Sequence, residues 1–143
     1  MTETEPVFVD TNILVYAHKS DEGERHTVAR RLLEQGTNGE IRLCISNQIM
    51  GEFCRVMRHK IKEPIPLKEI TNMVEEIVGL DAWMKINYTH QTVKKALSLS
   101  PDIFIWDAVI AQTMLENGIT KIYTENTKDF ENIKGIKAIN PFK

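Results

Sequence analysis

The sequence predicts an α/β fold, a three-layer sandwich in which helices flank a short parallel sheet of roughly four to five strands. Short apolar, β-prone runs alternate along the chain with longer segments of helical periodicity. Strands that are separated by helices pair in parallel through right-handed crossovers. The 143 residues contain no repeat and no low-complexity linker, so we expect one domain at 7–143 after a short polar N-terminal extension at 1–6.

The first half of the chain predicts two strands and three helices. Gly36 is expected to end the second helix, and Ser46 is expected to cap the third. In order, the elements are a strand at 7–9, helices at 11–18 and 22–35, a strand at 41–45, and a helix from Ser46 to about Lys60.

The second half begins after Pro64 and Pro66, which interrupt the helical pattern. The helix at 105–116 is apolar almost all round, so we expect it to be buried. The predicted elements are helices at 67–80, 89–98 and 105–116, and strands at 84–88, 121–124 and 137–140.

Composition limits the classes of protein. The formal net charge of −2 does not indicate a nucleic-acid binder by itself. There is no signal-peptide pattern and no apolar run of the ~18–20 residues that span a bilayer, so we expect a cytoplasmic protein. Cys44 and Cys54 are not spaced as a C-x-x-C pair and are expected to be buried free thiols. The four histidines are scattered, which argues against a zinc site.

Four acids stand out by their positions. Asp10 follows the first strand, as either a helix N-cap or a functional acid. Glu52 shares a helix face with four apolar residues, where a carboxylate needs a partner. Asp107 lies at the start of the apolar helix, where the helix N-terminus also favours an acid. Asp129 follows the strand at 121–124, and alone it is typical of a cap or a solvated loop.

These acids come from distant segments that can meet beyond the carboxyl ends of the strands. Clustered carboxylates raise each other's pKa unless a cation intervenes. Oxygen ligands without His or Cys favour Mg²⁺ or Mn²⁺. The chemistry of such a site is phosphodiester hydrolysis, in which bound metal lowers the pKa of the attacking water.

Five ordered motifs resemble the PIN-domain family, and most closely the VapC-type toxin ribonucleases of type II toxin–antitoxin systems. Each motif is weak alone, but together they cover nearly the whole chain. They are VFVDTN at 7–12, SNQIMGEF at 46–53, IWDAVIA at 105–111, YTENTKDF at 123–130 and INP at 139–141.

The resemblance implies a PIN-like domain with metal-dependent endoribonuclease activity. It implies Asp10, Glu52 and Asp107 as catalytic Mg²⁺ ligands, with Mn²⁺ as an alternative. Its usual fourth acid corresponds to Asn126, so Asp129 is the candidate replacement and the number of metals stays open. It also implies an RNA substrate, a homodimer and a cognate antitoxin. The residues expected to support the acids are Thr11, Asn12, Thr124 and Asn126.

Two further features have competing interpretations. A basic stripe at helical spacing is either a face that tracks RNA phosphates or a solvated helix surface. Trp106 could stack on a nucleobase, or it could belong to the core or to an interface. The sequence favours the core or an interface. The stripe consists of Arg55, Arg58, His59 and Lys62.

Three alternatives to a toxin ribonuclease remain. One is a PIN-like module that binds RNA or protein without efficient catalysis, and another is a PIN nuclease that processes RNA without being a toxin. A phosphatase of the haloacid-dehalogenase type would need a second acid two residues after Asp10, but Asn12 stands there and cannot transfer a proton.

Overall fold

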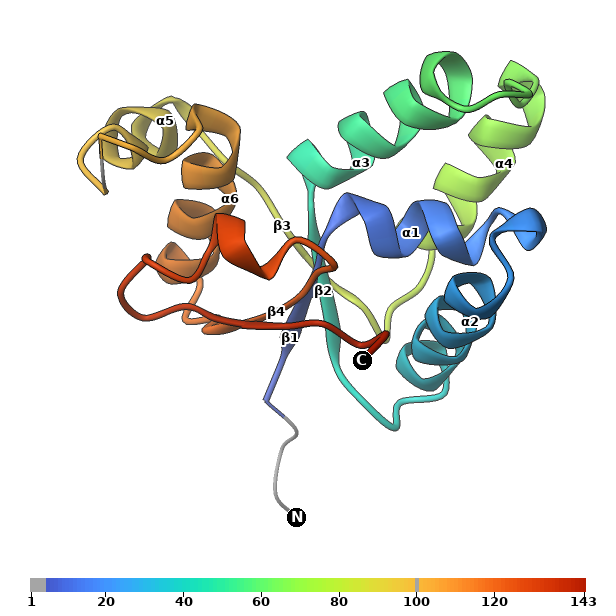
Figure 1. Cartoon of the computed structure of the whole chain (residues 1–143), viewed down its shortest axis with the longest axis horizontal. Helices are drawn as coiled ribbons and strands as arrows, with labels where there is room; N and C mark the ends of the chain where they lie inside the picture. The colour runs from blue at the N-terminus through green and yellow to red at the C-terminus, as the bar shows by residue number, and fades with distance from the viewer. Residues whose placement is uncertain (1–4, 100) are drawn as a thin grey trace.

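The computed structural model describes residues 5–99 and 101–143, and these form a five-stranded parallel sheet in the order β3-β2-β1-β4-β5 (Figure 1). All four strand pairs are parallel. The predicted parallel sheet is therefore confirmed. The strands are β1 (Val7–Val9), β2 (Leu43–Ser46), β3 (Met84–Ile86), β4 (Lys121–Tyr123) and β5 (Lys137–Ile139).

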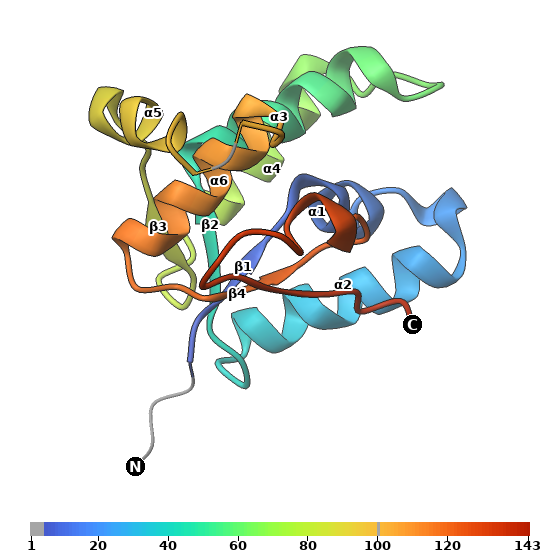
Figure 2. The ribbon, with the colours of Figure 1, turned by 60° about the vertical axis from the view of Figure 1, so that its left-hand side comes forward.

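Helices cover both faces of this sheet. α5 and α6 lie on one side, and α1, α2 and α4 lie on the other, which gives the predicted three layers (Figures 1 and 2). The helices in the described residues are α1 (Thr11–Ala17), α2 (Glu24–Thr37), α3 (Asn47–Arg55), α4 (Leu67–Val78), α5 (His90–Ala96) and α6 (Ile105–Glu116).

The path of the chain through the sheet positions the site. After β1 the chain adds β2 and β3 on one side, and it then returns to the other side of β1 with β4 and β5. The point where strand order reverses therefore lies between β1 and β4, at their carboxyl ends, where α/β proteins place their ligand sites. Phe8, Val9 and Ile122 of these strands are fully buried, so the edge of the site rests on the core.

Polar side chains start the helices where the sequence predicts. The Ser46 hydroxyl accepts a hydrogen bond from the Ile49 amide at 3.3 Å at the start of α3. Thr89 and Thr92 form a reciprocal capping box at the start of α5. Both caps satisfy amide groups that the first helical turn leaves without intrahelical partners.

Gly36 does not end α2, because the helix continues through it to Thr37. A Cβ at Gly36 would lie 2.5 Å from Leu43 Cδ1 and 3.2 Å from Trp83 Nε1. The glycine therefore allows β2 and the β3 region to approach α2 closely. A contact with distant residues, and not a helix stop, explains this glycine.

Three other expectations need correction. The helix expected to reach about Lys60 changes after α3 into a π-helical turn at Val56–Lys60. The expected burial of α6 is confirmed from Ala108 to Met114 for most residues, but Ile105 and Trp106 in its first turn are 36% and 43% exposed, so Trp106 does not belong to the core. Cys44 is a buried free thiol, but Cys54 is only half-buried.

Residues 1–4 of the expected N-terminal extension lie outside the described residues. Within the described chain, no helix has the length and apolar character that crossing a bilayer requires.

We predict that Gly36→Ala destabilises the fold despite the better helix propensity of alanine. The added methyl group overpacks the fully buried Leu43, at a cost of ~1–3 kcal/mol, which outweighs the ~1 kcal/mol propensity gain. The free energy of unfolding, measured in urea, should fall by ~1 kcal/mol. The matched control is Gly51→Ala in α3, where a Cβ meets no atom within 4 Å, and it should gain up to ~1 kcal/mol. Equal gains in both variants would contradict the prediction.

Candidate active site

Asp10 is fixed at the carboxyl end of β1 by three hydrogen bonds. Its amide donates to the Tyr123 carbonyl of β4 at 3.1 Å. Its Oδ1 accepts from the Thr11 amide at 2.8 Å, and its Oδ2 accepts from the Thr124 hydroxyl at 2.7 Å. Asp10 is thus the N-cap of α1 and also a positioned acid, so the two interpretations are compatible.

Glu52 reaches the same place from α3. Its Oε2 accepts from the Thr11 hydroxyl at 2.8 Å, and its Oε1 accepts from Gln48 Nε2 at 3.1 Å. Thr11 therefore contacts both acids, one through its amide and the other through its hydroxyl. The partners of the Glu52 carboxylate are therefore two neutral donors, the Thr11 hydroxyl and the Gln48 amide.

All four predicted acids line one cleft with a volume of ≈ 350 Å³. Asp107 enters from the first turn of α6, and Asp129 enters from the 3₁₀ turn after β4. The cleft is lined by Asp10, Thr11, Asn12, Val15, Tyr16, Glu52, Arg55, Val56, Asp107, Ile110, Asn126 and Asp129. Segments far apart in the sequence thus supply a single acidic site.

Burial and the neighbouring carboxylates disfavour the charged forms of Asp10 and Asp107. Burial, together with the charges of Asp129, Asp10 and Glu52, raises the pKa of Asp107 to about 6. Burial also raises the pKa of Asp10, although hydrogen bonds from Thr124 and Thr11 oppose this, and the charges of Glu52 and Asp129 raise it further. None of the four acids forms an ion pair with another residue in 5–99 and 101–143.

The acids share a cleft, but they are not drawn together. Across the described part of the chain, no three His, Cys, Asp or Glu side chains are grouped so that they could hold a metal ion as they stand.

The expected supporting residues lie around the same cleft. The Asn12 side-chain oxygen accepts from the Glu125 amide at 3.4 Å, and the Asn126 amide donates to the Thr124 hydroxyl at 3.1 Å. Asn126, which the resemblance aligns with the usual fourth acid, lines the cleft together with Asp129.

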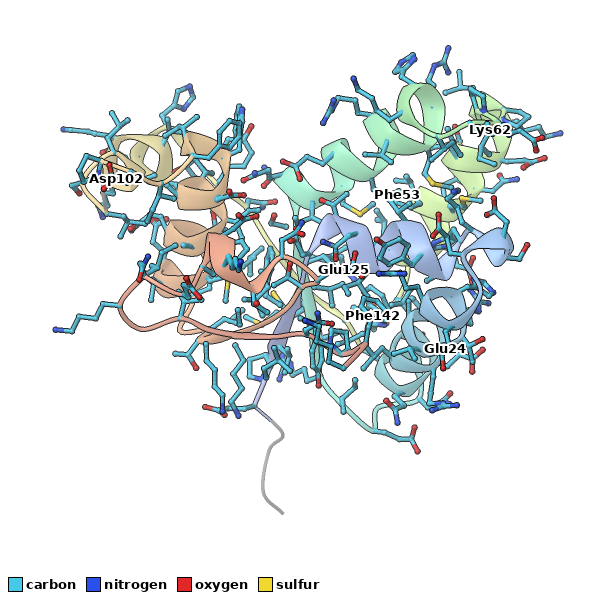
Figure 3. The ribbon with its side chains drawn as sticks, in the orientation of Figure 1. Glu24, Phe53, Lys62, Asp102, Glu125 and Phe142 are labelled. Atoms are coloured by element: carbon cyan, nitrogen blue, oxygen red, sulfur yellow. The ribbon has the colours of Figure 1, made fainter. Side chains whose placement is uncertain are left out.

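The basic stripe does not continue as a single face. Arg55 lines the acidic cleft, but the π-helical turn changes the angular spacing of the residues that follow. Lys62 lies at the far end of the α3–α4 arm, in a hollow with Lys19 and Asp21 (Figure 3). RNA binding by Arg55, Arg58, His59 and Lys62 stays a prediction, and only Arg55 lies at the cleft.

Sequence reasoning missed the roles of two polar residues near the site, Glu125 and Gln48. Glu125 turns away from the acids, because it accepts from the Tyr16 hydroxyl at 2.6 Å and from Arg25 (Figure 3). Burial raises the pKa of Glu125, but these two donors lower it more, so its net pKa is below the ordinary value. Gln48 was also missed, although its position four residues before Glu52 on one helix face could have indicated it.

Comparison with known proteins identifies the family of this chain. The chain matches the PIN domain family model over residues 7–136. Ribonuclease VapC43 of Mycobacterium tuberculosis is 30% identical over 119 residues, which cover 78% of this chain and 80% of that protein.

Solved structures share the fold. VapC20 of Mycobacterium tuberculosis, described as a sarcin-ricin loop cleaving toxin, has a TM-score of 0.62 and 17% identity over 82% of this chain and 88% of its own. VapBC2 from Rickettsia felis, bound to a DNA fragment from their promoter, has a TM-score of 0.64 and 18% identity over 94% of this chain and 98% of its own. The family match and the 30% identity to VapC43 confirm the resemblance, and the chain belongs to the PIN domain family.

Proposed function

We infer that this protein is a divalent-metal-dependent endoribonuclease and the toxin of a toxin–antitoxin pair. The observation that carries this proposal is the convergence of Asp10, Glu52, Asp107 and Asp129 on one cleft. VapC43, a relative at 30% identity, is named a ribonuclease, which supports RNA as the substrate.

The donor set of the cleft fits Mg²⁺ or Mn²⁺. It offers carboxylate oxygens and no His or Cys side chain, and these are the ligands that hard divalent cations prefer. The pKa values of Asp10 and Asp107 are raised by burial and by the neighbouring carboxylates, and added positive charge would offset both effects. A bound ion would supply this charge, polarise the scissile phosphate and lower the pKa of the attacking water.

The residues of the chain have separate roles in this proposal. Asp10, Glu52 and Asp107 hold the ion, and Asp129 contributes directly or through water. Thr11 and Thr124 orient the first two acids through the hydrogen bonds described above. Arg55 lines the cleft without an ion pair within the described chain, so its guanidinium group is available to a phosphate.

The proposed partners are an antitoxin protein and a second copy of this chain. The VapBC2 structure of Rickettsia felis has a fold like that of this chain, which supports a partner of the antitoxin kind. Exposed apolar side chains offer surface for such contacts, namely Leu67, Val78, Leu97, Phe104, Ile105 and Trp106.

A PIN module that binds RNA or protein without turnover is the second candidate. The neutral Asn126 and the open spacing of the acids favour it. Metal-dependent RNA cleavage by the purified protein that is lost in Glu52→Gln would eliminate this candidate.

We predict that Asp10→Asn lowers RNA cleavage by more than ~100-fold, because changes to residues that merely support a metal ligand already cost ~10–100-fold. Thr124→Val keeps the shape of the side chain but loses its hydrogen bond to Asp10, so it should fall in that ~10–100-fold range. Cleavage is measured with purified protein and Mg²⁺ or Mn²⁺. Asp81→Asn, an exposed acid outside the cleft, serves as the control. Full activity of Asp10→Asn, or of wild type in excess EDTA, would rule out the proposed function.

We also predict that Asp107 destabilises the metal-free protein at neutral pH. Its pKa is about 6 in the folded state, against ~3.9 in an unfolded chain, so the folded state keeps a proton that the unfolded state loses. The free energy of unfolding should therefore fall as the pH rises from ~4 to about 6.

Urea denaturation in EDTA tests this prediction at pH 4 and pH 7. Asp107→Asn should be more stable than wild type at pH 7 by ~1 kcal/mol, a value reduced for solvent screening of a half-buried group, and the difference should vanish at pH 4. Added Mn²⁺ should raise the stability of wild type more than that of the variant. A less stable Asp107→Asn at pH 7 would contradict the prediction.

A further inference from the structure

A second hollow adjoins the acidic cleft and has a different chemical character. It has a volume of ≈ 370 Å³, within the ~300–1,000 Å³ range of pockets that hold small organic ligands. It shares Glu52 and Arg55 with the acidic cleft. Its lining is Asn47, Gln48, Gly51, Glu52, Arg55, Tyr88 and Trp106.

Two aromatic rings form one wall of this hollow. Tyr88 and Trp106 are in an edge-to-face arrangement, with ring centroids 6.2 Å apart and planes at 80°. Trp106 is 43% exposed, so much of its indole surface has no protein contact. An exposed indole beside a phosphodiester-cleaving site is the kind of platform on which nucleobases stack, because every base has a π-face.

Gln48 ties this wall to the acidic site. Its Nε2 donates to Glu52 Oε1 at 3.1 Å and to the Trp106 carbonyl at 3.0 Å. Because both neighbours are acceptors, the amide orientation is fixed with the nitrogen toward them. One side chain thus joins α3 to the first turn of α6, and it relates the indole platform to a predicted metal ligand.

The same bridge leaves Gln48 Oε1 as a buried acceptor without a hydrogen-bond partner in the described structure. A buried acceptor with no donor destabilises a fold. Gln48 therefore does not serve stability alone, and its two donor bonds organise the boundary between the two hollows.

Gly51 keeps the hollow open on the α3 side. It lies in the middle of α3, where glycine is the weaker helix former, and a Cβ there would meet no atom within 4 Å. No steric constraint on the backbone of α3 thus accounts for this glycine. A larger side chain at this position can extend into the hollow, whose lining includes Gly51 itself.

We propose that this hollow is a nucleobase subsite, in which the base next to the scissile phosphate stacks on Trp106 while its phosphate lies at Arg55 and the acidic cleft. The proposal rests on the ribonuclease function inferred above. It favours single-stranded RNA over a protein segment because flat exposed rings, a shared arginine and adjacent phosphodiester chemistry occur together.

Tryptophan fluorescence tests the subsite without requiring cleavage. The chain has two tryptophans, and Trp83 is only 3% exposed with no hydrogen-bond partner for its Nε1 in the described chain. Trp83→Phe therefore leaves Trp106 as the only source of tryptophan fluorescence. Nucleosides and short single-stranded RNA, titrated in EDTA at low ionic strength, should quench this emission in a saturable way.

Variants in the Trp83→Phe background locate the binding. Gly51→Leu should fill the hollow and raise the apparent Kd for RNA roughly 5–150-fold, the effect expected from losing one stacked base. Phe104→Ala is the matched control, since it removes a neighbouring exposed aromatic ring that lines neither hollow. Thermal melting confirms that each variant is folded.

Four outcomes decide the matter. Equal quenching by an abasic ribose-phosphate chain, or quenching only by a protein partner, would overturn the nucleobase subsite. Absence of quenching in a protein that still cleaves RNA with Mg²⁺ would also overturn it and leave the proposed function intact. If quenching is saturable and is weakened by Gly51→Leu, but RNA is not cleaved at any metal concentration, the subsite is supported and the proposed nuclease function is rejected.

Discussion

β1 and β4 run in parallel with Val9 opposite Tyr123, and this register places the first residues after both strands side by side. Asp10 consequently meets the hydroxyl of Thr124. A slip of one residue would turn the side chains of β4 to the opposite face of the sheet and remove this contact. The core prevents such a slip because Ile122 is fully buried in the correct register. Hydrophobic packing in the middle of the sheet therefore fixes the geometry of an acid at its edge.

The order and type of the main elements were predictable because each depends on local periodicity. The failures occurred where distant residues decide the local structure. Gly36 reads as a helix stop in isolation, but Leu43 and Trp83 give it another role in the folded chain. The first turn of α6 is as apolar as the rest of the helix, yet Ile105 and Trp106 in this turn are 36% and 43% exposed. An apolar pattern can thus predict a helix without predicting which of its turns are covered by the rest of the protein.

The acids of the site were predictable to different degrees. Glu52 and Asp107 stood out because each is a carboxylate within an apolar helical pattern. Asp129 had no such signal and was a candidate only through the family resemblance, and the structure places it in the acidic cleft. The direction of the Glu125 side chain could not be read from the sequence, since it depends on Tyr16 and Arg25, which lie 109 and 100 residues before it. Hydrogen bonds between distant segments thus decide which of several neighbouring polar residues face the cleft.

The hydrogen-bond partners of Glu52 orient this acid while leaving its negative charge available to a cation. A lysine or arginine paired with Glu52 would satisfy its charge and compete with any metal ion for the same oxygens. The observed donors, the Thr11 hydroxyl and the Gln48 amide, orient the carboxylate without neutralising it. Burial, and then the charges of Asp129, Asp10 and Glu52, raise the pKa of Asp107. Arg55 lies at the wall shared by both hollows and forms no ion pair with these acids in the described structure, so its charge can act on a phosphate bound across them. In the function proposed above, neutral support beneath the acids and a separate cation at the wall would together favour an anionic ligand once a divalent ion is bound.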